Sequence, residues 1–324
     1  MTRLPDPCPV VTVIGEALID LVAEGAHHHC YRARPGGSPY NVAIGLARLG
    51  VRTSLMARLA DNGFGRLLRA HAQQEGLDLS AAPHAVEPTT LAVVSLDEQS
   101  HVSYDFYLQG TADWQWTPAE VARLRQDTAV LHFGSIASWT QPGSEQVLAM
   151  VREVHAAGRA LTSYDPNVRP SLLGDPARGR ELVEGNVGIS HLVKASREDV
   201  EWLYPGIGIE HVAARWLELG ALLVVVTDGA YGAQAFRPGL PAVRREGRST
   251  RLVDSVGAGD SFTAGLVAGL IERGLHTADR LARLEDPSLQ GLLDEAALVS
   301  SPTCERSGAA PPTAADRGLA RVGR

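Results

Sequence analysis

Beyond residue 118, short apolar runs alternate with longer segments whose apolar residues recur at helical spacing. The runs of strand length cover residues 129–133, 160–164, 192–194 and 222–227. The helical patterns cover residues 144–157, 197–203, 211–219 and 261–273. Strands that alternate with helices predict βαβ units and a parallel sheet. In an open sheet of this kind, ligands bind beyond the carboxyl ends of the strands, and most candidate motifs directly follow a predicted strand.

The N-terminal part of the chain adds elements of the same kind and then changes pattern. Strands are expected at 10–14 and 54–59, and helices at 40–49 and 63–75. Residues 89–96 and 101–108 are β-rich runs on either side of a polar tetrapeptide, which indicates a hairpin. Together with the edge-strand-like segment after Asp20, they predict a small accessory sheet.

The composition is that of a folded protein without a basic binding surface. The 324 residues are 44% hydrophobic, enough to fill a sizeable core, and the formal charge is −7. An acidic chain gives no reason to expect a nucleic acid or an anionic membrane as partner. No apolar leader precedes Pro9 and no apolar run is long enough to span a bilayer, so we expect a cytoplasmic protein.

The cysteines and histidines indicate neither a disulfide framework nor a zinc site. Cys8, Cys30 and Cys304 are far apart, odd in number and form no C-x-x-C pair. Residues 27–29 are consecutive histidines, and consecutive side chains of an extended segment point to alternate faces. We therefore expect an exposed loop there.

The most informative stretch is residues 254–260, DSVGAGD, which lead directly into an apolar helical pattern. Gly257, Ala258 and Gly259 are small enough to let backbone amides face one point, where the helix adds its positive end. Such a place suits a phosphate. Asp260 would repel a resting phosphate, but it could take the proton from a hydroxyl that attacks one. A glycine-rich turn with Asp260 as the N-cap of a core helix is an equal alternative.

Polar residues near the first strand are suited to a sugar. Asp20 lies past that strand and could accept hydrogen bonds from two hydroxyls. Gly36 and Gly37 permit close approach of a ligand just before Asn41, whose amide is both donor and acceptor. Taken alone, a solvated turn at Asp20 and an ordinary helix N-terminus after Gly37 are the stronger interpretations.

The loop at residues 165–170, DPNVRP, follows a predicted strand and is stiffened by two prolines. Asp165, Asn167 and Arg169 could face a phosphate or a sugar there. A stiff capping turn is an equal alternative.

Two more strand ends carry candidate residues. Ser196 is a plausible N-cap with Asp199 three residues later, which favours a capping box over magnesium binding through water. Thr227, Gly229 and Gly232 end a strongly apolar strand and suit a nucleotide phosphate. The Asp-Gly pair within that segment is also common in hairpin turns.

In this order, these segments resemble the ribokinase-like (PfkB) carbohydrate kinase family from about residue 11 to about residue 312. The DSVGAGD stretch matches the family's C-terminal signature, and Gly36, Gly37 and Asn41 match its N-terminal signature. The segments that look most like the fructokinase branch are residues 15–20, 104–107, 110–113, 165–170 and 304–309.

The resemblance implies an α/β fold with a doubly wound, mostly parallel sheet flanked by helices and a small β-sheet lid. Residues 1–312 would form one kinase domain, with the lid drawn from about 21–35 and 89–113. Residues 313–324 would be a flexible tail. In relatives the lid can also be a dimer interface, so a homodimer through the lid is expected.

The resemblance also implies transfer of the γ-phosphate of ATP, with Mg²⁺, to a sugar hydroxyl. Asp260 would be the general base, and the amides of Gly257, Ala258 and Gly259 would hold the developing charge. The sugar would be bound by Asp20, Gly36, Gly37, Asn41, Tyr104, Phe106 and Arg169. ATP would be bound by Lys194, Thr227, Gly229, Gly232, Gly257 and Gly259.

Metal ligands are less well specified by the resemblance. Asp254 often belongs to a loop that binds a monovalent cation, usually K⁺, in this family. Asp199 and Glu198 would support Mg²⁺ through water, although Ser196 stands where some relatives have the asparagine of an N-x-x-E motif. Residues 300–302, SSP, predict a break in the last helix.

A fructokinase-like sugar kinase is the first functional expectation. A 2-keto-3-deoxygluconate kinase is the second, because Arg169 could pair with the carboxylate of that substrate. A nucleoside kinase is a weaker third. A non-catalytic sugar-binding regulator on the same fold is the alternative of another class, and the intact Asp260 with its glycine loop argues against it.

Overall fold

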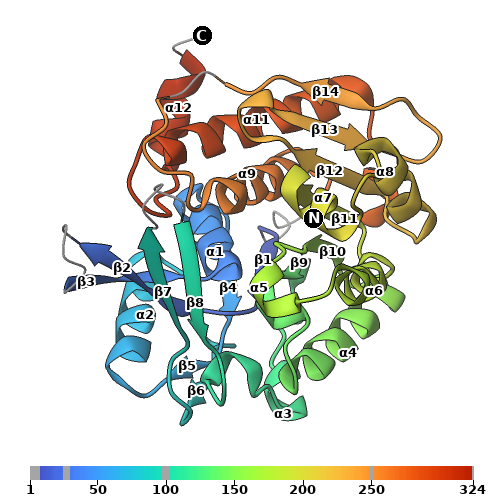
Figure 1. Cartoon of the computed structure of the whole chain (residues 1–324). Coiled ribbons are helices and arrows are strands. Elements are labelled where there is room, and N and C mark those ends of the chain that lie inside the picture. The colour runs from blue at the N-terminus through green and yellow to red at the C-terminus, as the bar shows by residue number, and fades with distance from the viewer. Residues whose placement is uncertain (1–7, 25–29, 97–101, 249–250, 323–324) are drawn as a thin grey trace, which may run out of the picture.

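The computed structural model describes residues 8–24, 30–96, 102–248 and 251–322. Its centre is an eight-stranded sheet in the order β14-β13-β12-β11-β10-β9-β1-β4 (Figure 1). Neighbouring strands are parallel from β4 to β12, and the last two pairs, β12 with β13 and β13 with β14, are antiparallel. The strands are β1 (Val10–Ile14), β4 (Thr53–Met56), β9 (Thr128–Gly134), β10 (Leu161–Asp165), β11 (Leu192–Ser196), β12 (Leu223–Thr227), β13 (Ala233–Phe236) and β14 (Val243–Arg245).

Helices cover both faces of this sheet, because its inner strands are apolar on both sides. In β12, Leu223 and Val225 belong to one core cluster, whereas Val224 and Val226 belong to the other. The first cluster contains α1 (Ser38–Arg48), α2 (Gly63–Gln74), α9 (Ala258–Glu272), α10 (Ala278–Ala282) and α11 (Asp286–Cys304). The second contains α3 (Pro118–Val121), α4 (Gly143–Ala156), α6 (Pro176–Val187), α7 (Arg197–Leu203) and α8 (Ile209–Glu218). Among the residues described, no helix has the length and apolarity needed to cross a membrane.

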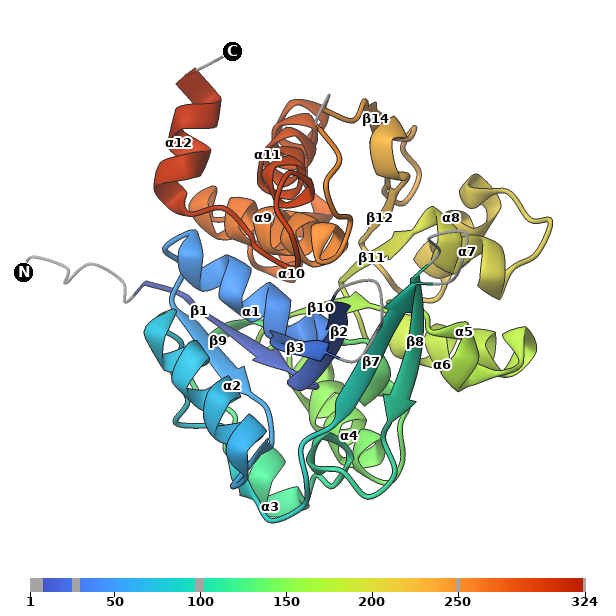
Figure 2. The same ribbon diagram turned by 60° about the vertical axis from the view of Figure 1, so that its left-hand side comes forward.

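A second sheet of four strands, here called the lid sheet, has the order β3-β2-β7-β8. Its strands are β2 (Leu18–Glu24), β3 (Cys30–Gly36), β7 (Leu91–Leu96) and β8 (Val102–Tyr107). Figure 2 shows β7 and β8 standing in front of the central sheet rather than extending it. The pair β5 (Leu59–Ala60) and β6 (His84–Ala85) forms a separate short ladder. A dimer formed through the lid sheet stays a prediction.

The predicted fold class is confirmed, and most predicted elements lie within a few residues of their observed bounds. The pattern did not indicate β13, β14 or α6, or the short helix α5 (Pro170–Leu173). The consecutive histidines at 27–29 lie outside the described residues.

The break expected at residues 300–302 is wrong, because α11 continues to Cys304 with Pro302 inside the helix. Proline removes one backbone donor. Side-chain hydroxyls bond to the carbonyls on either side of that step: Ser301 donates to the Ala297 carbonyl and Thr303 to that of Val299.

The C-terminal segment also differs from the flexible tail that we expected, since it contains helix α12 (Ala314–Val322). Arg317 on this helix is buried and pairs with Glu272 at the end of α9. Just before the helix, Arg48 of α1 donates to the carbonyl of Pro311 at 2.9 Å. These contacts hold the segment against the first core cluster.

Candidate active site

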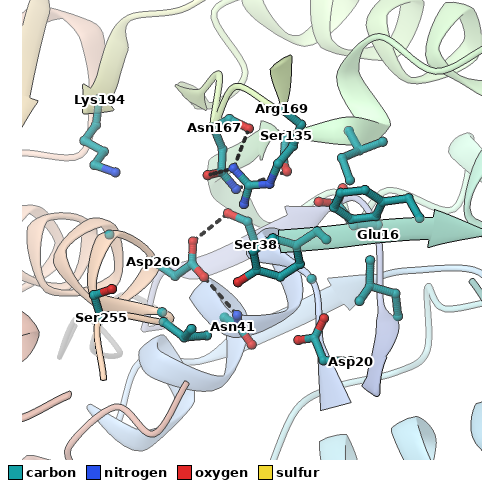
Figure 3. A pocket seen from close by; sticks show the side chains of 18 residues that line it. Glu16, Asp20, Ser38, Asn41, Ser135, Asn167, Arg169, Lys194, Ser255 and Asp260 are labelled. Atoms are coloured by element: carbon teal, nitrogen blue, oxygen red, sulfur yellow. Dashed lines mark hydrogen bonds between the residues drawn. The ribbon is translucent and has the colours of Figure 1, made fainter. Parts of the chain in front are cut away.

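A cavity of about 350 Å³ lies between the lid sheet and the carboxyl ends of the central strands (Figure 3). The N-termini of α1 and α9 both open into it. The polar side chains that line it come from strand ends, helix starts and the lid sheet: Glu16, Asp20, Ser38, Asn41, Tyr104, Ser135, Asn167, Arg169, Lys194, Ser255 and Asp260. The position agrees with the rule that ligands of parallel sheets bind at this edge.

Asp260 lies between the first turns of two helices. It is the third residue of α9, whose N-cap is Gly257, so the alternative in which Asp260 caps the helix is wrong. Its Oδ1 accepts a hydrogen bond from Ser38 Oγ at 2.6 Å, and its Oδ2 accepts one from Asn41 Nδ2 at 2.8 Å (Figure 3). Both donors belong to the start of α1, so the carboxylate bridges α1 and α9 inside the cavity.

The electrostatics of Asp260 are set by burial and by its partners. Burial raises the pKa of this carboxyl group, and the hydrogen bonds from Ser38 and Asn41 lower it. Asp165 raises the same pKa and Lys194 lowers it through charge alone. The positive ends of two helices also favour a negative group at this point.

The glycine loop forms a tight turn at the start of α9, and the anion-binding role of its amides stays a prediction. Gly257 has φ 75°, a left-handed conformation, and a Cβ there would lie 2.5 Å from the Cβ of Ala309. At Gly259, a Cβ would lie 3.0 Å from Nζ of Lys194, so the loop and this ammonium group are neighbours. Of the three predicted amides, that of Ala258 already donates to the Ser255 carbonyl at 3.2 Å.

Asp20 lies within β2 and lines the cavity, so the solvated turn is wrong for this residue. A Cβ on Gly36 would lie only 2.1 Å from Asp20 Oδ2, so glycine is required for Asp20 to occupy its place. Burial raises the pKa of Asp20 to about 6, while Arg169 lowers it and Asp260 raises it. Gly37 has φ 101°, and a Cβ there would lie 2.7 Å from the Glu16 carbonyl oxygen.

The remaining residues predicted to bind sugar come from the lid sheet and from the loop after β10. Tyr104 and Phe106 of β8 stack with ring centroids 5.8 Å apart, and both line the cavity. Arg169 also lines it, with Nη1 donating to Oδ1 of Asn167 at 2.9 Å and to the Val168 carbonyl at 3.0 Å. Asn167 has φ 41°, so this loop is held in a strained turn by its own side chains.

Lys194 forms a buried ion pair with Asp165, with Nζ 2.9 Å from Oδ2. Burial lowers the pKa of Lys194. The neighbouring carboxylates, chiefly Asp165, together raise it by more than burial lowers it, so the pKa lies above its ordinary value. Lys194 lies in the middle of β11, and its charged Nζ reaches the cavity next to Gly259.

The residues predicted to face ATP phosphates from β12 do not line this cavity. Thr227 follows the same sheet edge, paired in register with Ser196 of β11, and its Oγ1 donates to the Ala195 carbonyl at 3.3 Å. Gly229 has φ 48° and Gly232 has φ 100° in the turn that joins β12 to antiparallel β13. The hairpin alternative therefore describes the turn correctly, and nucleotide binding there stays a prediction.

Residues 10–315 match the pattern of the pfkB family carbohydrate kinases. The chain belongs to this family. A fructokinase from Rhizobium leguminosarum bv. trifolii is 34% identical over 285 residues, covering 87% of this chain and 86% of the relative. A fructokinase from Klebsiella pneumoniae is 32% identical, covering 85% of this chain and 88% of the relative. The protein is therefore a carbohydrate kinase, a phosphotransferase whose acceptor is a sugar.

Solved structures agree with this kinase over nearly its whole length. A Xylella fastidiosa fructokinase with bound ATP superposes with a TM-score of 0.89 and 24% identity, covering 98% of this chain and 99% of that one. At this level of identity, the agreement shows that the two proteins share a fold. A Vibrio cholerae O395 fructokinase in a form with fructose, ADP and calcium bound gives a TM-score of 0.80 and 28% identity, covering 93% and 94%.

Some residues that line the kinase's cavity were not assigned a role from the sequence, among them Ser38, Ser135 and Glu16. Ser38 stands inside the N-terminal signature, so the motif itself was the available signal. Ser135 follows β9, and Glu16 follows β1, at the same carboxyl edge as the other candidates. Glu16 Oε2 accepts from the Ala137 amide at 3.1 Å, and such a contact between distant segments is invisible in the sequence.

The candidate metal ligands of the kinase are engaged by the protein itself. Asp199 accepts from the amides of Val168 at 2.7 Å and Ser196 at 2.8 Å, within the capping box that the sequence favoured. Asp254 accepts from the amides of Val256 at 3.0 Å and Gly308 at 2.7 Å. Glu198 is exposed to solvent. Within the described ranges, no three carboxylate, histidine or cysteine side chains are grouped to hold a metal ion.

Proposed function

We propose that this protein is an ATP-dependent, fructokinase-like sugar kinase in which Asp260 is the general base. The observation that carries the proposal is the place of Asp260: a partly buried carboxylate that lines a cavity of about 350 Å³, beside an open helix N-terminus. The N-terminus suits the transferring phosphate, and the carboxylate suits the proton of the acceptor hydroxyl.

The sugar would lie between the lid sheet and α1. Asp20 can accept hydrogen bonds from two hydroxyls, and the rings of Tyr104 and Phe106 form an apolar wall on the lid side. One hydroxyl would reach Asp260, and its oxygen would attack the terminal phosphorus as the proton passes to the carboxylate. The bond from that phosphorus to the leaving diphosphate would then break in line.

The charge of the transferring group would be balanced from two directions. Backbone amides at Gly257 and Gly259 lie in the first turn of α9, where helix donors have no intrahelical partner. Lys194 Nζ lies beside Gly259 and already carries its charge in the Asp165 pair. Thr227, Gly229 and Gly232 would hold the rest of the nucleotide at the neighbouring strand end.

Magnesium would act chiefly as a companion of the nucleotide, because Mg²⁺ usually keeps several waters and binds substrate phosphates. Asp199 is buried, accepts two backbone amides and does not line the cavity, so it does not fit a direct ligand, and support from Asp199 or Glu198 through water stays a prediction. The Asp254 carboxylate ties residue 256 to residue 308 in the loop, which fits an organising role for the K⁺ loop inferred from resemblance.

The test is an ADP-release assay with MgATP across fructose, 2-keto-3-deoxygluconate, ribose, glucose and nucleosides, with and without K⁺. Preference for fructose supports the proposal. Preference for the keto acid would instead favour a 2-keto-3-deoxygluconate kinase, in which Arg169 pairs with the carboxylate of the substrate. Binding of a sugar without any ADP release would favour the regulator. Asp260→Asn should abolish turnover while ATP and sugar still bind, and near-normal kcat in that variant would overturn the base assignment.

A further inference from the structure

The hydroxyl of Ser38 donates a hydrogen bond to Asp260 and does not cap its own helix, α1. Its Oγ lies 2.6 Å from Asp260 Oδ1, and it must be the donor because an ionised carboxylate only accepts. Gly37, not Ser38, is the N-cap of α1, and no side chain caps that helix end. Ser38 is only 7% exposed, so its hydroxyl is held at one place in the cavity wall.

We propose that Ser38 is a positioning residue that aims the carboxylate of Asp260 at the acceptor hydroxyl and holds it in its ionised form. The proposal rests on the function proposed above, because it assigns the residue that prepares the base. Ser38 itself would not touch the transferring phosphate.

The hydrogen-bond count leaves room for the sugar. A carboxylate offers about four acceptor positions, two on each oxygen. Ser38 takes one position on Oδ1, and Asn41 takes one on Oδ2. Because the two donors grip different oxygens, they fix the plane of the carboxylate and leave a free position on each oxygen for the acceptor hydroxyl.

The surroundings of Asp260 make this hydrogen bond matter for ionisation. Titratable groups whose charges couple to it are Lys194 in β11, Asp165 in β10, Asp20 in β2 and Tyr104 in β8. The charged residues Glu16 and Arg169 line the same cavity. Asp165 and Asp20 are acidic neighbours, and Lys194 is already paired with Asp165. Burial acts in the same direction as these carboxylates and raises the pKa of Asp260, whereas Ser38 is the foremost group that lowers it.

The experiment is the pH dependence of kcat at saturating sugar and MgATP for wild type and Ser38→Ala. We expect the acidic limb of the Ala profile to move upward by about one pH unit, the size typical for a hydrogen bond to a charged group. At pH values below the acidic limb, kcat of Ser38→Ala should be about tenfold lower than that of wild type, and the difference should largely disappear at higher pH. Using kcat keeps the titration of Asp20 in the free enzyme out of the comparison.

Two further variants separate this role from general damage. Ser255→Ala removes another hydroxyl from the same cavity, and no described hydrogen bond joins Ser255 to Asp260, so its limb should stay in place. Ser38→Thr keeps a hydroxyl and should keep the wild-type limb even if the extra methyl lowers kcat. If Ser38→Ala does not fold, Ser38→Cys provides the same comparison with a much weaker donor.

The Asp260 carboxyl group can also be titrated directly by ¹³C NMR in labelled, substrate-free protein, with Asp260→Asn assigning the signal. An upward shift of that titration in Ser38→Ala supports the proposal without relying on turnover. An unmoved limb and an unmoved titration, or an equal loss of kcat at every pH, would overturn it. An active Asp260→Asn variant would instead overturn the general-base function, so the two failures are distinguishable.

Discussion

Nζ of Lys194 lies 2.9 Å from Oδ2 of Asp165, and this buried pair borders the glycine loop at Gly259. Lys194 is the only lysine among the 30 lysine and arginine residues of the chain. An ammonium group is compact, and its donors can turn from one oxygen to another. The pair thus places a movable positive charge beside the proposed path of the phosphate.

We expect Lys194→Met to lower kcat about 100-fold, the scale of losing one donor to a developing oxyanion. The same change leaves Asp165 buried without its cation, which should cost about 3–5 kcal/mol of unfolding free energy. Steady-state kinetics and urea unfolding measure the two effects separately.

The double variant Lys194→Met with Asp165→Asn is the control for that experiment. Removing both charges should restore most of the stability, because no uncompensated charge remains buried. Activity should stay low. Recovery of kcat along with stability would show that Lys194 has only a structural role.

Gly36→Ala should weaken sugar binding through Asp20. The new Cβ would fall 2.1 Å from Asp20 Oδ2, so the carboxylate must leave its place in the cavity. We expect KM for the sugar to rise at least tenfold while the affinity for ATP changes little, as measured by kinetics and by calorimetry with each ligand. Gly63→Ala is a matched control, since a Cβ at Gly63 meets nothing within 4 Å.

The pH dependence of sugar binding should follow Asp20. Its pKa is raised from 3.8 to about 6, chiefly by burial, so protons begin to neutralise this acceptor as the pH falls through 6. Sugar affinity measured by calorimetry without nucleotide should therefore fall toward tenfold per pH unit below that point. Asp20→Asn should bind more weakly and without this dependence, and a wild-type affinity that is flat from pH 7 to 5 would contradict the role of Asp20.

The elements of the fold were predictable because local signals agree with it. Residues 197–203 form a helix at the bounds predicted, since Ser196 and Asp199 form the capping box that the sequence favoured. Strand β1 likewise begins and ends where its apolar run does. By contrast, β14 has only three residues, and its pairing with β13 is decided by neighbours distant in sequence.

The composition of the site was less predictable than its position. The carboxyl ends of the strands indicated where ligands bind, and the glycine loop indicated Asp260. Nothing local shows that Ser38, 222 residues away in sequence, would share this carboxylate with Asn41. That contact exists because α1 packs against α9, with Gly45 close to Ala264. Likewise, Asp199 accepts a hydrogen bond from Val168 and Asp254 accepts one from Gly308 only because the fold brings these distant loops together.

A buried histidine should make stability depend on pH. Burial lowers the pKa of His132 from 6.5 to about 4, so the unfolded chain binds its proton first as the pH falls. The contribution of this residue is complete above pH 6.5 and is lost progressively toward pH 4, about 2 kcal/mol between pH 7 and 5. Asp113, whose pKa burial raises to about 7, acts in the opposite direction over this range.

For that reason the measurement is the difference between two unfolding profiles. Wild type and His132→Gln should be compared by urea unfolding at pH 7 and pH 5. Glutamine is chosen because its amide does not titrate and can keep a hydrogen bond with Ser163. We expect the gap between the variants to narrow or reverse by about 2 kcal/mol at the lower pH. Parallel profiles would show that His132 does not titrate in this window.

Gly257→Ala should separate transition-state stabilisation from substrate binding. The new methyl group would lie 2.5 Å from the Cβ of Ala309, so the loop must move away from residue 309 and its amides must turn from their common point. Because those amides matter most when charge develops on the phosphate, kcat should fall by about 100-fold or more with little change in KM for the sugar.

Gly239→Ala is the control: Gly239 has φ 68°, close to the 75° of Gly257, but a Cβ there meets nothing within 4 Å. Both changes force alanine into a left-handed conformation at a cost of about 1–2 kcal/mol, so equal stability losses with unequal kcat would assign the difference to the loop's amides. An equal fall in kcat in both variants would instead attribute the effect to backbone strain.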